Sequence, residues 1–222
     1  MSEYESPEWH PALEEYCETI YELGEDELDV IQARIAERMN VSRPAVSEMV
    51  KRLEAEGLIE AGRQIALTDK GIHLAETVVR RHRLAECFLT DILGLSWAEA
   101  HQEAGKWEHI ISPTVEKAMM GRLNDPTTCP HGNPIPGSAY EAPELVALDE
   151  IEVGNQFTVQ RIPEELEFTE GMLDFLENSF ITPGSTGMVT AMSPDGTATV
   201  EIGGSAIGVG GFATARILVT AG

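Results

Sequence analysis

The stretch IAERMNVSRPAVSEMVKRLEAEGLI, residues 35–59, decides the fold of the first part of this chain. A helix ends before the short connection at residues 40–42, and a second amphipathic helix follows. Ser42 is a suitable N-cap, and Pro44 fits the first turn of the second helix, where its missing N–H costs nothing. Gly57 is a typical helix stop. The stretch therefore predicts a helix-turn-helix unit.

The flanking segments extend this unit. Residues 11–23 carry apolar side chains at helical spacing, and a further helix is expected over residues 29–39. After the unit, LIEAG and RQIALT (residues 58–68) read as two short strands of a hairpin. Helix, helix, turn, helix and hairpin follow one another in the order of a winged helix-turn-helix. We therefore predict a DNA-binding domain of this type over residues 1–72.

The charge of the chain is strongly negative but unevenly distributed. Thirty-eight acidic and 15 basic residues give a net charge of −23, which by itself argues against binding to nucleic acid or anionic membranes. Residues 34–83, however, hold ten of the 15 basic residues and only seven acidic ones. This basic window coincides with the predicted winged helix and favours DNA binding. The excess of acid, with four Lys against 11 Arg, suits a protein that works in concentrated salt.

Other function classes are disfavoured by the sequence. It has no apolar run of transmembrane length, and the N-terminal MSEYESPEWH lacks the apolar core of a signal peptide. Its three cysteines are too few and too scattered for a disulfide framework. We therefore expect a cytoplasmic protein with no membrane partner. No Ser-His-Asp set, phosphate-binding loop or dinucleotide fingerprint is found, so we predict that it is not an enzyme.

The rest of the chain divides into a helical and a β-rich part. Helices are predicted over 71–93, 97–103 and 105–123, within a helical domain that spans residues 73–137. Residues 138–149 are typical of a linker. Short alternating runs punctuated by glycine then predict a small antiparallel β-barrel or sheet over residues 150–222. The expected fold class is α+β.

Several side chains that can bind metals lie at helical spacing. Glu15 and Glu18 share one helix face, as do His82 and Glu86, and further Glu and His residues follow on later helical segments. Carboxylates and imidazoles on three helices could form a divalent-cation site, although solvated surface pairs are the alternative. The candidate ligands from spacing alone are Glu15, Glu18, His82, Glu86, His101, Glu108 and His109. Cys129 and His131 form a further pair, but their Pro-rich setting is more typical of a simple turn.

With these motifs in view, the sequence resembles the diphtheria toxin repressor family of iron- and manganese-dependent regulators. The resemblance rests on residues 35–59 and on four further motifs, and it spans residues 11–137 closely. These motifs are EEYCETIYEL (14–23), RRHRLAECFLTDILGL (80–95), HQEAGKWEHIIS (101–112) and CPHGNPIPG (129–137). Residues 150–222 are similar to the SH3-like (FeoA-like) domain of the family, with weaker motifs.

The resemblance implies a homodimeric, metal-dependent repressor that binds a palindromic double-stranded DNA operator and controls metal-uptake genes. Residues 73–137 would be the metal-binding and dimerisation domain. One alternative is a metal-binding protein without DNA function, which would not explain the winged helix or its positive charge. Another is an activator of the same fold that works in its metal-free form.

The resemblance also implies two metal sites per subunit. The primary site takes Glu15, Glu108 and His109, and Glu18 matches a ligand of the manganese branch. Gly105 stands where relatives carry Cys or Glu, and it offers no side chain. The second site is implied to contain His82, Glu86 and His101 together with Glu164 and Glu167 from the SH3-like domain. Because both soft ligands of the iron regulators are absent, Mn(II) is favoured, with Fe(II) as the alternative.

The predicted DNA contacts lie mainly on the second helix of the helix-turn-helix unit. Ser42 and Ser47 can reach phosphates, while Pro44 and Ala45 can contact a thymine methyl group. Arg43 can bind a guanine base or a phosphate group. Glu48, at a position where relatives commonly have Gln, can accept a hydrogen bond from the amino group of cytosine. For Ser47 and Glu48, a merely solvated helix face is the alternative. The full predicted set is Arg34, Ser42, Arg43, Pro44, Ala45, Ser47, Glu48, Lys51, Arg52 and Arg63.

Overall fold

A computed structural model of the chain describes residues 11–222. The predicted absence of a signal peptide concerns residues 1–10, which lie outside the described residues. The helices are α1 (Pro11–Glu25), α2 (Gln32–Arg38), α3 (Arg43–Ala55), α4 (Asp69–Asp91), α5 (Trp97–Trp107), α6 (Pro113–Arg122), η1 (Leu148–Glu150), α7 (Glu164–Glu167), α8 (Met172–Asn178) and α9 (Gly211–Thr214). The strands are β1 (Ile59–Ala61), β2 (Ile65–Leu67), β3 (Val146–Ala147), β4 (Gln156–Arg161), β5 (Thr186–Met192), β6 (Ala198–Ile202), β7 (Ser205–Val209) and β8 (Leu218–Ala221).

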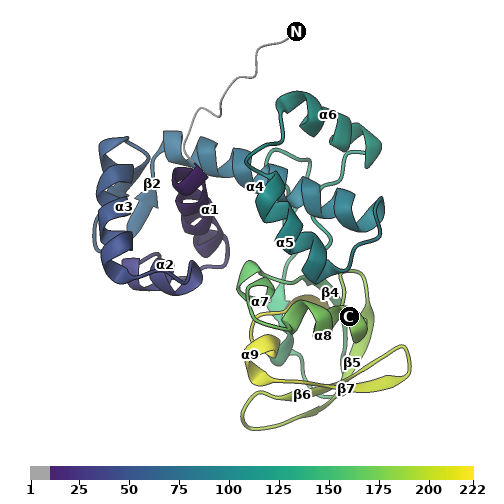
Figure 1. Ribbon diagram of the computed structural model, residues 1–222. Helices are drawn as coiled ribbons and strands as arrows, with labels where there is room; N and C mark the ends of the chain where they lie inside the picture. Colours follow the sequence, from purple (N-terminus) through teal and green to yellow (C-terminus); the bar gives the residue numbers. More distant parts are fainter. Residues whose placement is uncertain (1–10) are drawn as a thin grey trace.

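The predicted winged helix-turn-helix is present. Helices α1, α2 and α3 pack around one apolar core, and β1 pairs with β2 in an antiparallel hairpin (Figure 1). Ser42 caps α3 as predicted, since its Oγ accepts a hydrogen bond from the amide of Ala45 at 3.3 Å. Helix α2 begins three residues later than predicted. The preceding residues run beside β2 instead, because the amide of Ile65 donates to the carbonyl of Val30 at 2.8 Å.

The predicted helices over 97–103 and 105–123 are wrong in their boundaries. Helix α5 continues through Gly105 to Trp107, and α6 begins only at Pro113. The reason is capping: Ser112 Oγ accepts from the amide of Val115 at 3.4 Å, and Pro113 fits the first turn. Residues 108–112 therefore form a connection, and the two predicted ligands in it lie at the C-terminal end of α5 rather than inside a helix.

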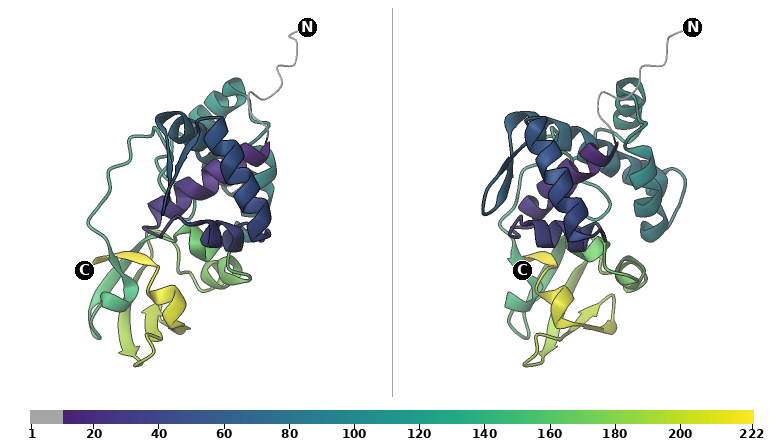
Figure 2. Two further views of the ribbon diagram at one scale, coloured as in Figure 1. Left: turned by 90° about the vertical axis from the view of Figure 1, so that its left-hand side faces the viewer. Right: turned by 60° about the vertical axis from the view of Figure 1, so that its left-hand side comes forward.

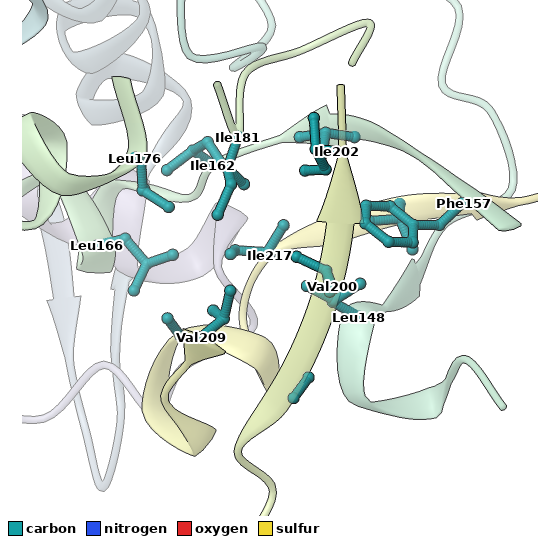
Figure 3. Close-up of a cluster of buried hydrophobic side chains, with 14 of the residues drawn as sticks. Leu148, Phe157, Ile162, Leu166, Leu176, Ile181, Val200, Ile202, Val209 and Ile217 are labelled. Atoms are coloured by element: carbon teal, nitrogen blue, oxygen red, sulfur yellow. The ribbon is translucent and has the colours of Figure 1, made fainter. Parts of the chain in front are cut away.

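The C-terminal part contains a six-stranded antiparallel sheet in the order β3-β8-β4-β5-β6-β7. This sheet is SH3-like, as predicted, and it is an open sheet rather than a closed barrel. Leu166 of α7 and Leu176 of α8 pack with Val200 and Ile217 in the core of this part (Figure 3). The predicted linker is also shorter than expected, because β3 and η1 already belong to this part and Leu148 is fully buried in its core.

The helical and β-rich parts pack directly on each other. Trp97, at the start of α5, belongs to the core of the β-rich part, and its backbone amide donates to Glu177 of α8 at 3.1 Å. Helix α4 runs from the winged helix to the region of α5 and α6, so it bridges two parts of the molecule (Figure 1). An extended segment at 139–145 leads from the helical region to the sheet (Figure 2). Within residues 11–222, no helix is long and apolar enough to cross a membrane.

Candidate metal centre and DNA-binding surface

The first group of predicted ligands gathers where α1 meets the end of α5. Glu15 and Glu18 come from α1, Glu108 caps the C-terminus of α5, and His109 follows it. Nε2 of His109 lies 3.2 Å from Glu108 Oε1 and 3.8 Å from Glu15 Oε1. We call Glu14, Glu15, Glu18, Glu108 and His109 the α1–α5 cluster. Helical spacing and the topology together therefore unite the four ligands predicted for the primary site.

Glu14 is a member of this cluster that the sequence reasoning missed. Its Oε2 lies 2.6 Å from Nδ1 of His109, and its side chain is buried. Hydrogen bonds that the protonated His109 ring donates to Glu14 and Glu15 raise the pKa of His109 to about 10. A carboxylate on one imidazole nitrogen orients the ring and leaves the other nitrogen to a metal. Glu14 is thus a positioning residue that aims Nε2 of His109 at Glu108 and Glu15. The sequence signal that could have identified Glu14 was its position directly before Glu15, on the helical turn that faces α5.

Glu18 and Glu108 meet in the interior beside His82. Donor atoms of these three residues lie within 4.8 Å of one another, and all three side chains are buried. Burial and the neighbouring Glu108 carboxylate raise the pKa of Glu18 well above its usual value. Two buried carboxylates in contact repel each other unless a proton or a cation lies between them. The pair is therefore suited to a divalent cation.

Gly105 lies on the wall of a cavity that this cluster opens into. The cavity has a volume of about 690 Å³, and Glu15, Glu18 and Glu108 line it with Gly105. A Cβ atom at Gly105 would meet no described atom within 4 Å. There is consequently open space at the position where relatives carry a ligand side chain.

The second group of predicted ligands gathers between α4, α5 and α7. Nδ1 of His101 lies 3.1 Å from Glu86 Oε1 and 3.2 Å from Glu167 Oε2, and Nε2 of His82 lies 3.3 Å from the same Glu86 oxygen. Glu164 belongs to the same group, because the donor atoms of His101, Glu164 and Glu167 all lie within 4.8 Å of one another. We call His82, Glu86, His101, Glu164 and Glu167 the α4–α7 cluster. All five residues predicted for the second site thus come together.

His82 lies between the two clusters and contacts both. Its Nδ1 is 2.5 Å from Glu108 Oε2, while its Nε2 faces Glu86. Burial disfavours the charged ring, but Glu86 and Glu108 outweigh this and raise the pKa of His82 well above its usual value. The prediction assigned His82 to the second site alone. The geometry leaves one ring nitrogen for each cluster, so occupancy of one cluster can affect the other.

The two carboxylates from α7 are held differently. Arg83 Nη2 donates to Glu164 Oε1 at 3.0 Å, whereas Asn133 Nδ2 donates to Glu167 Oε1 at 2.6 Å. Each of these hydrogen bonds occupies the Oε1 atom of its carboxylate. The Oε2 atom remains for the cluster. Burial opposes ionisation of Glu86, but the nearby His131 and His82 keep its pKa well below the usual value. Glu86 therefore stays charged although its side chain is buried, whereas burial and the neighbouring Glu167 raise the pKa of Glu164.

Cys129 and His131 contact the α4–α7 cluster, and the sequence reasoning set them aside as a turn. A turn is present, since the amide of Gly132 donates to the carbonyl of Cys129 at 3.0 Å. The same turn directs His131 Nδ1 to 2.8 Å from Glu167 Oε2 and 3.5 Å from Glu86 Oε1. The sequence prediction treated a turn and a polar cluster as alternatives, but both are present. The sequence signal for the cluster was the pair of Cys129 and His131 on either side of Pro130.

The donor sets fit a divalent metal ion on grounds of hydrogen bonding. Glu18 Oε1, Glu86 Oε2 and Glu164 Oε2 are buried oxygens without a hydrogen-bond partner in the part of the chain that the structure describes. Buried carboxylate oxygens without partners are costly. A cation coordinated by imidazole and carboxylate would satisfy them.

Ion pairs connect the α4–α7 cluster to the end of α1. Arg83 is fully buried and pairs with Glu25 of α1 at 2.5 Å as well as with Glu164. Arg161 of β4 pairs with Asp26 at 2.9 Å. These contacts join the winged helix to both other parts of the molecule.

The predicted DNA-binding residues lie on the start of α3, its outer face and the hairpin. Ser42, Arg43, Pro44, Ala45, Glu48, Lys51, Arg52 and Arg63 are exposed, whereas Arg34 and Ser47 are half-buried. Arg34 Nη1 also lies 3.5 Å from the carbonyl of Asp29. The exposed members therefore form one accessible surface, with the guanidinium and ammonium groups free to meet phosphate.

The basic window of the sequence is only partly a DNA surface. Arg38 pairs with Glu22 and Asp26, and Arg83 is buried, as described above. Arg80 and Arg81 both contact Glu116. These four arginines connect elements of the protein, so fewer basic residues face solvent than the sequence count suggests.

Comparison with known proteins identifies the family. The family model described as iron dependent repressor, N-terminal DNA binding domain, matches residues 10–66, and that described as iron dependent repressor, metal binding and dimerisation domain, matches residues 68–137. The iron-dependent repressor IdeR of Mycobacterium tuberculosis H37Rv is 38% identical over 204 residues, covering 86% of this chain and 88% of that protein. The diphtheria toxin repressor of Corynebacterium diphtheriae is 45% identical over 144 residues, covering 64% of this chain and 59% of that protein.

The structural comparison agrees with this. A manganese-dependent transcriptional repressor in complex with manganese superposes with a TM-score of 0.85 and 32% identity, covering 94% of this chain and 99% of that one. These relatives are repressors, which supports the prediction of a regulator rather than an enzyme, and favours the repressor over a metal-binding protein without DNA function. Iron- and manganese-dependent proteins both occur among them. The chain therefore belongs to the iron-dependent repressor family and is a divalent-metal-dependent, DNA-binding transcriptional repressor that dimerises with a second copy of itself.

Proposed function

We propose that this repressor responds to Mn(II), with Fe(II) as the alternative, bound in the α1–α5 cluster, and that it represses metal-uptake genes from a palindromic operator. The observation that carries the proposal is the meeting of buried carboxylates from α1 with Glu108 and His109 at the end of α5. A repressor of this kind acts on the chromosome, so we propose a cytoplasmic location.

The position of α1 links metal binding to DNA binding. Leu13, Cys17 and Ile20 of α1 belong to the core of the winged helix, while Glu15 and Glu18 of the same helix face the end of α5. A cation between these groups would fix the winged helix relative to the helices of the dimerisation part. Metal would thereby favour the arrangement of two winged helices that fits an operator, which is a population shift.

The donor chemistry supports Mn(II). The ligands proposed for the primary site are Glu15, Glu18, Glu108 and His109, and none of them contains sulfur. Carboxylates suit Mn(II), whereas thiolate and thioether ligands favour softer ions. We propose that His82, Glu86, His101, Glu164 and Glu167 form a second site, which holds the SH3-like part against α4 and α5.

Contacts to DNA are proposed for the exposed residues of α3 and the hairpin. Lys51, Arg52 and Arg63 would hold the backbone, and the residues at the start of α3 would enter the major groove. Glu48 would accept from a cytosine amino group, and it would repel nearby phosphates. Arg34 and Ser47, being half-buried, would contribute at the edge of the surface.

The proposal is tested by measuring DNA affinity as metal is added. Duplexes would be selected from random sequence by the Mn(II)-loaded protein and then titrated by fluorescence anisotropy with and without Mn(II). We expect tight binding only with metal, and symmetric half-sites in the selected sequences. Reciprocity requires that the selected duplex raise Mn(II) affinity by the same factor. Equal metal affinity with and without DNA would contradict the switch.

Variants test the α1–α5 cluster in the same assay. Glu15→Ala and Glu18→Gln should abolish the Mn(II) response, whereas Glu37→Gln, on the exposed side of α2, should retain it. Unchanged Mn(II) affinity in Glu15→Ala would remove Glu15 from the site. Metal binding without any DNA binding would favour the metal-binding alternative instead, and DNA-dependent activation without metal would favour the activator.

A further inference from the structure

The winged helix and the SH3-like part touch each other directly, beside the two metal-binding clusters (Figure 2). The first contact is made by Asp26, the residue that follows α1. Its Oδ2 accepts from the backbone amide of Glu165 in α7 at 3.2 Å, and its Oδ1 accepts from Nη2 of Arg161 in β4 at 2.9 Å. Both oxygens of one buried carboxylate of the winged helix are therefore engaged by the SH3-like part.

The second contact is made by Arg38, the last residue of α2. Its guanidinium carbon lies 4.7 Å from the centre of the ring of Phe168, which directly follows α7. The arginine side chain is 6% exposed, and both of its Nη atoms lack a hydrogen-bond partner in the part of the chain that the structure describes. The nearby carboxylates of Glu22 and Asp26 lie at 3.7 and 3.8 Å, beyond hydrogen-bonding distance. The ring face attracts a cation at the observed distance, so it is an important partner of Arg38.

Phe168 serves contact between parts of the molecule rather than the core of its own part. The residue is 51% exposed, and it does not belong to the apolar core of the SH3-like part. Its ring also meets that of His101 in α5 nearly at a right angle, with the ring centroids 5.1 Å apart. One half-exposed ring therefore touches both α2 and α5, and its loss removes little apolar burial from the SH3-like part.

Both contacts lie where they can set the position of the DNA-binding unit. Asp26 follows α1, whose earlier turns carry Glu15 and Glu18 toward α5. Arg38 ends α2 and precedes the turn at 39–42 that leads into α3. In the arrangement described above, the donors of the α1–α5 cluster meet and both contacts are formed. Contacts that exist only in one arrangement raise its population, so these contacts and a bound cation favour the same position of the winged helix.

We propose that these residues form a metal-independent contact by which the SH3-like part holds the winged helix in the position that binds metal and DNA. We call Asp26, Arg38, Arg161, Glu165 and Phe168 the α7 contact. Asp26 and Phe168 are positioning residues, since neither belongs to the proposed metal sites or to the DNA surface. The inference rests on the proposed function only for its effect on Mn(II) and DNA. Without the α7 contact the binding-competent arrangement is less populated, and the apparent Mn(II) affinity falls by that fraction.

Substitution of Phe168 tests the proposal because it separates the aromatic face from apolar bulk. Phe168→Leu removes the face, so Mn(II) affinity should fall about three- to tenfold, and DNA binding should need correspondingly more Mn(II). Phe168→Tyr keeps the face and should behave as the wild type. Phe180→Leu is the control, because Phe180 is 72% exposed in the same part. Full Mn(II) affinity in Phe168→Leu, or an equal loss in Phe168→Tyr, would overturn the proposal.

Hydrogen exchange of the metal-free protein tests the α7 contact itself. Amide exchange over residues 164–168 would be followed by mass spectrometry in the wild type and two variants. Asp26→Ala removes the acceptor of the Glu165 amide, so exchange in this segment should be about five- to tenfold faster. Glu27→Ala, an exposed neighbour on the same turn, should leave the exchange unchanged. Equal exchange in the wild type and Asp26→Ala would overturn the proposal.

A second segment covers the case in which Asp26→Ala does not fold. Exchange over residues 32–42 is then compared between the wild type and Phe168→Leu, where loss of the partner of Arg38 should make it faster. Unchanged exchange there would overturn the proposal. No metal or DNA enters these exchange measurements. The α7 contact can therefore stand if Mn(II) is not the effector, and the Mn(II) response of the wild type can stand if the α7 contact fails.

Discussion

The α1–α5 cluster and the α4–α7 cluster are built from the same residue types but differ in exposure and in what they connect. In the first, the Glu15 side chain is 52% exposed. Both clusters line one cavity, the first through Glu15, Glu18 and Glu108 and the second through His101 and Glu167. In the second, Glu86, Glu164 and Glu167 are nearly completely buried. The first joins the winged helix to α5, whereas the second joins α4 and α5 to α7. An ion can therefore exchange more readily in the first.

This difference suggests a division of roles between sensing and holding. A sensor has to release its ion when the supply falls, and a site with the exposed Glu15 permits this. The closed cluster is reinforced by Arg83, Asn133 and the turn at 129–132, so it resembles a structural joint.

Arg83→Met should produce the largest effect, and it acts on the closed cluster. Arg83 is fully buried and pairs with both Glu25 and Glu164. Removing one partner of a buried ion pair leaves an uncompensated charge and costs about 3 to 5 kcal/mol. Urea unfolding of metal-free protein would measure the loss, with the exposed Arg122→Met as control. If the free energy of unfolding fell by less than about 1 kcal/mol, the ion pairs of Arg83 with Glu25 and Glu164 would not be what holds these parts together.

Metal affinity should rise steeply with pH in the open cluster. Hydrogen bonds from the His109 ring to Glu14 and Glu15 raise the pKa of His109 to about 10, so at neutral pH the metal-free ring is protonated. Metal needs the neutral ring, so binding releases a proton and affinity should rise about tenfold per pH unit below that pKa. Calorimetry from pH 6 to 8, in buffers of different ionisation enthalpy, would count the protons. A pH-independent affinity would contradict this.

The stability of the metal-free protein should change in the opposite direction. Burial disfavours the charged His101 ring, but hydrogen bonds that the ring donates to Glu167 and Glu86 raise its pKa to about 9, above the unfolded value near 6.5. The stabilisation that protonated His101 gives the folded protein is complete below the pKa of the unfolded state. It is lost as the pH rises through the folded-state pKa of about 9. The free energy of unfolding, from urea titrations at pH 6.5 to 9.5, should therefore fall with pH, and added metal should oppose the fall.

Glu14→Ala tests the positioning of His109 in the open cluster. Glu14 contacts Nδ1 and does not face the other ligands, so its loss should weaken Mn(II) binding by about 10- to 100-fold, as outer partners of metal-bound imidazoles do. The slope of affinity against pH should also shift toward that of an ordinary histidine. Glu37→Ala is the control for loss of one negative charge. Unchanged affinity and pH profile would show that Glu14 has no role in orienting the ring.

Gly105 tests whether the open cluster accepts another ligand. Because no described atom would lie within 4 Å of a Cβ there, Gly105→Glu should fit and raise Mn(II) affinity about tenfold relative to Gly105→Ala. Gly105→Cys should instead favour Fe(II) or Zn(II). The alanine variant is the reference because any side chain in α5 also stabilises the helix by about 1 kcal/mol. Competition titrations with two metals would measure the shift, and identical selectivity in all three variants would contradict it.

Most of the fold follows from local sequence signals. Ser42, Pro44 and Gly57 identify the boundaries of α3 because caps and stops act over a few residues. The limits of α5 and α6 were missed because Gly105 reads locally as a break, although the capping by Ser112 decides where α6 begins. The sequence left open whether the β-rich part forms a barrel or an open sheet, since strand periodicity says nothing about closure of a sheet.

The site was less predictable, and the reason is its long-range geometry. Spacing on one helix could pair Glu15 with Glu18, and resemblance supplied the partners on other segments. Neither could show that His131 meets Glu86 and Glu167, because the approach depends on how the turn at 129–132 docks on β4. Likewise, the charge count of the basic window could not tell that Arg83 is buried.

The smallest predicted effect concerns salt and the DNA surface. Four arginines of the basic window are engaged within the protein, so few basic residues remain for phosphates, and DNA affinity should fall less steeply with salt than in a more basic relative. Lys51→Ala removes one exposed contact from each subunit, so the slope of log affinity against log salt should shrink by about 2 in the dimer. Lys117→Ala, on α6, is the control. An unchanged slope in Lys51→Ala would remove that face of α3 from the DNA interface, and with it the assumption that the positive charge of the window serves DNA.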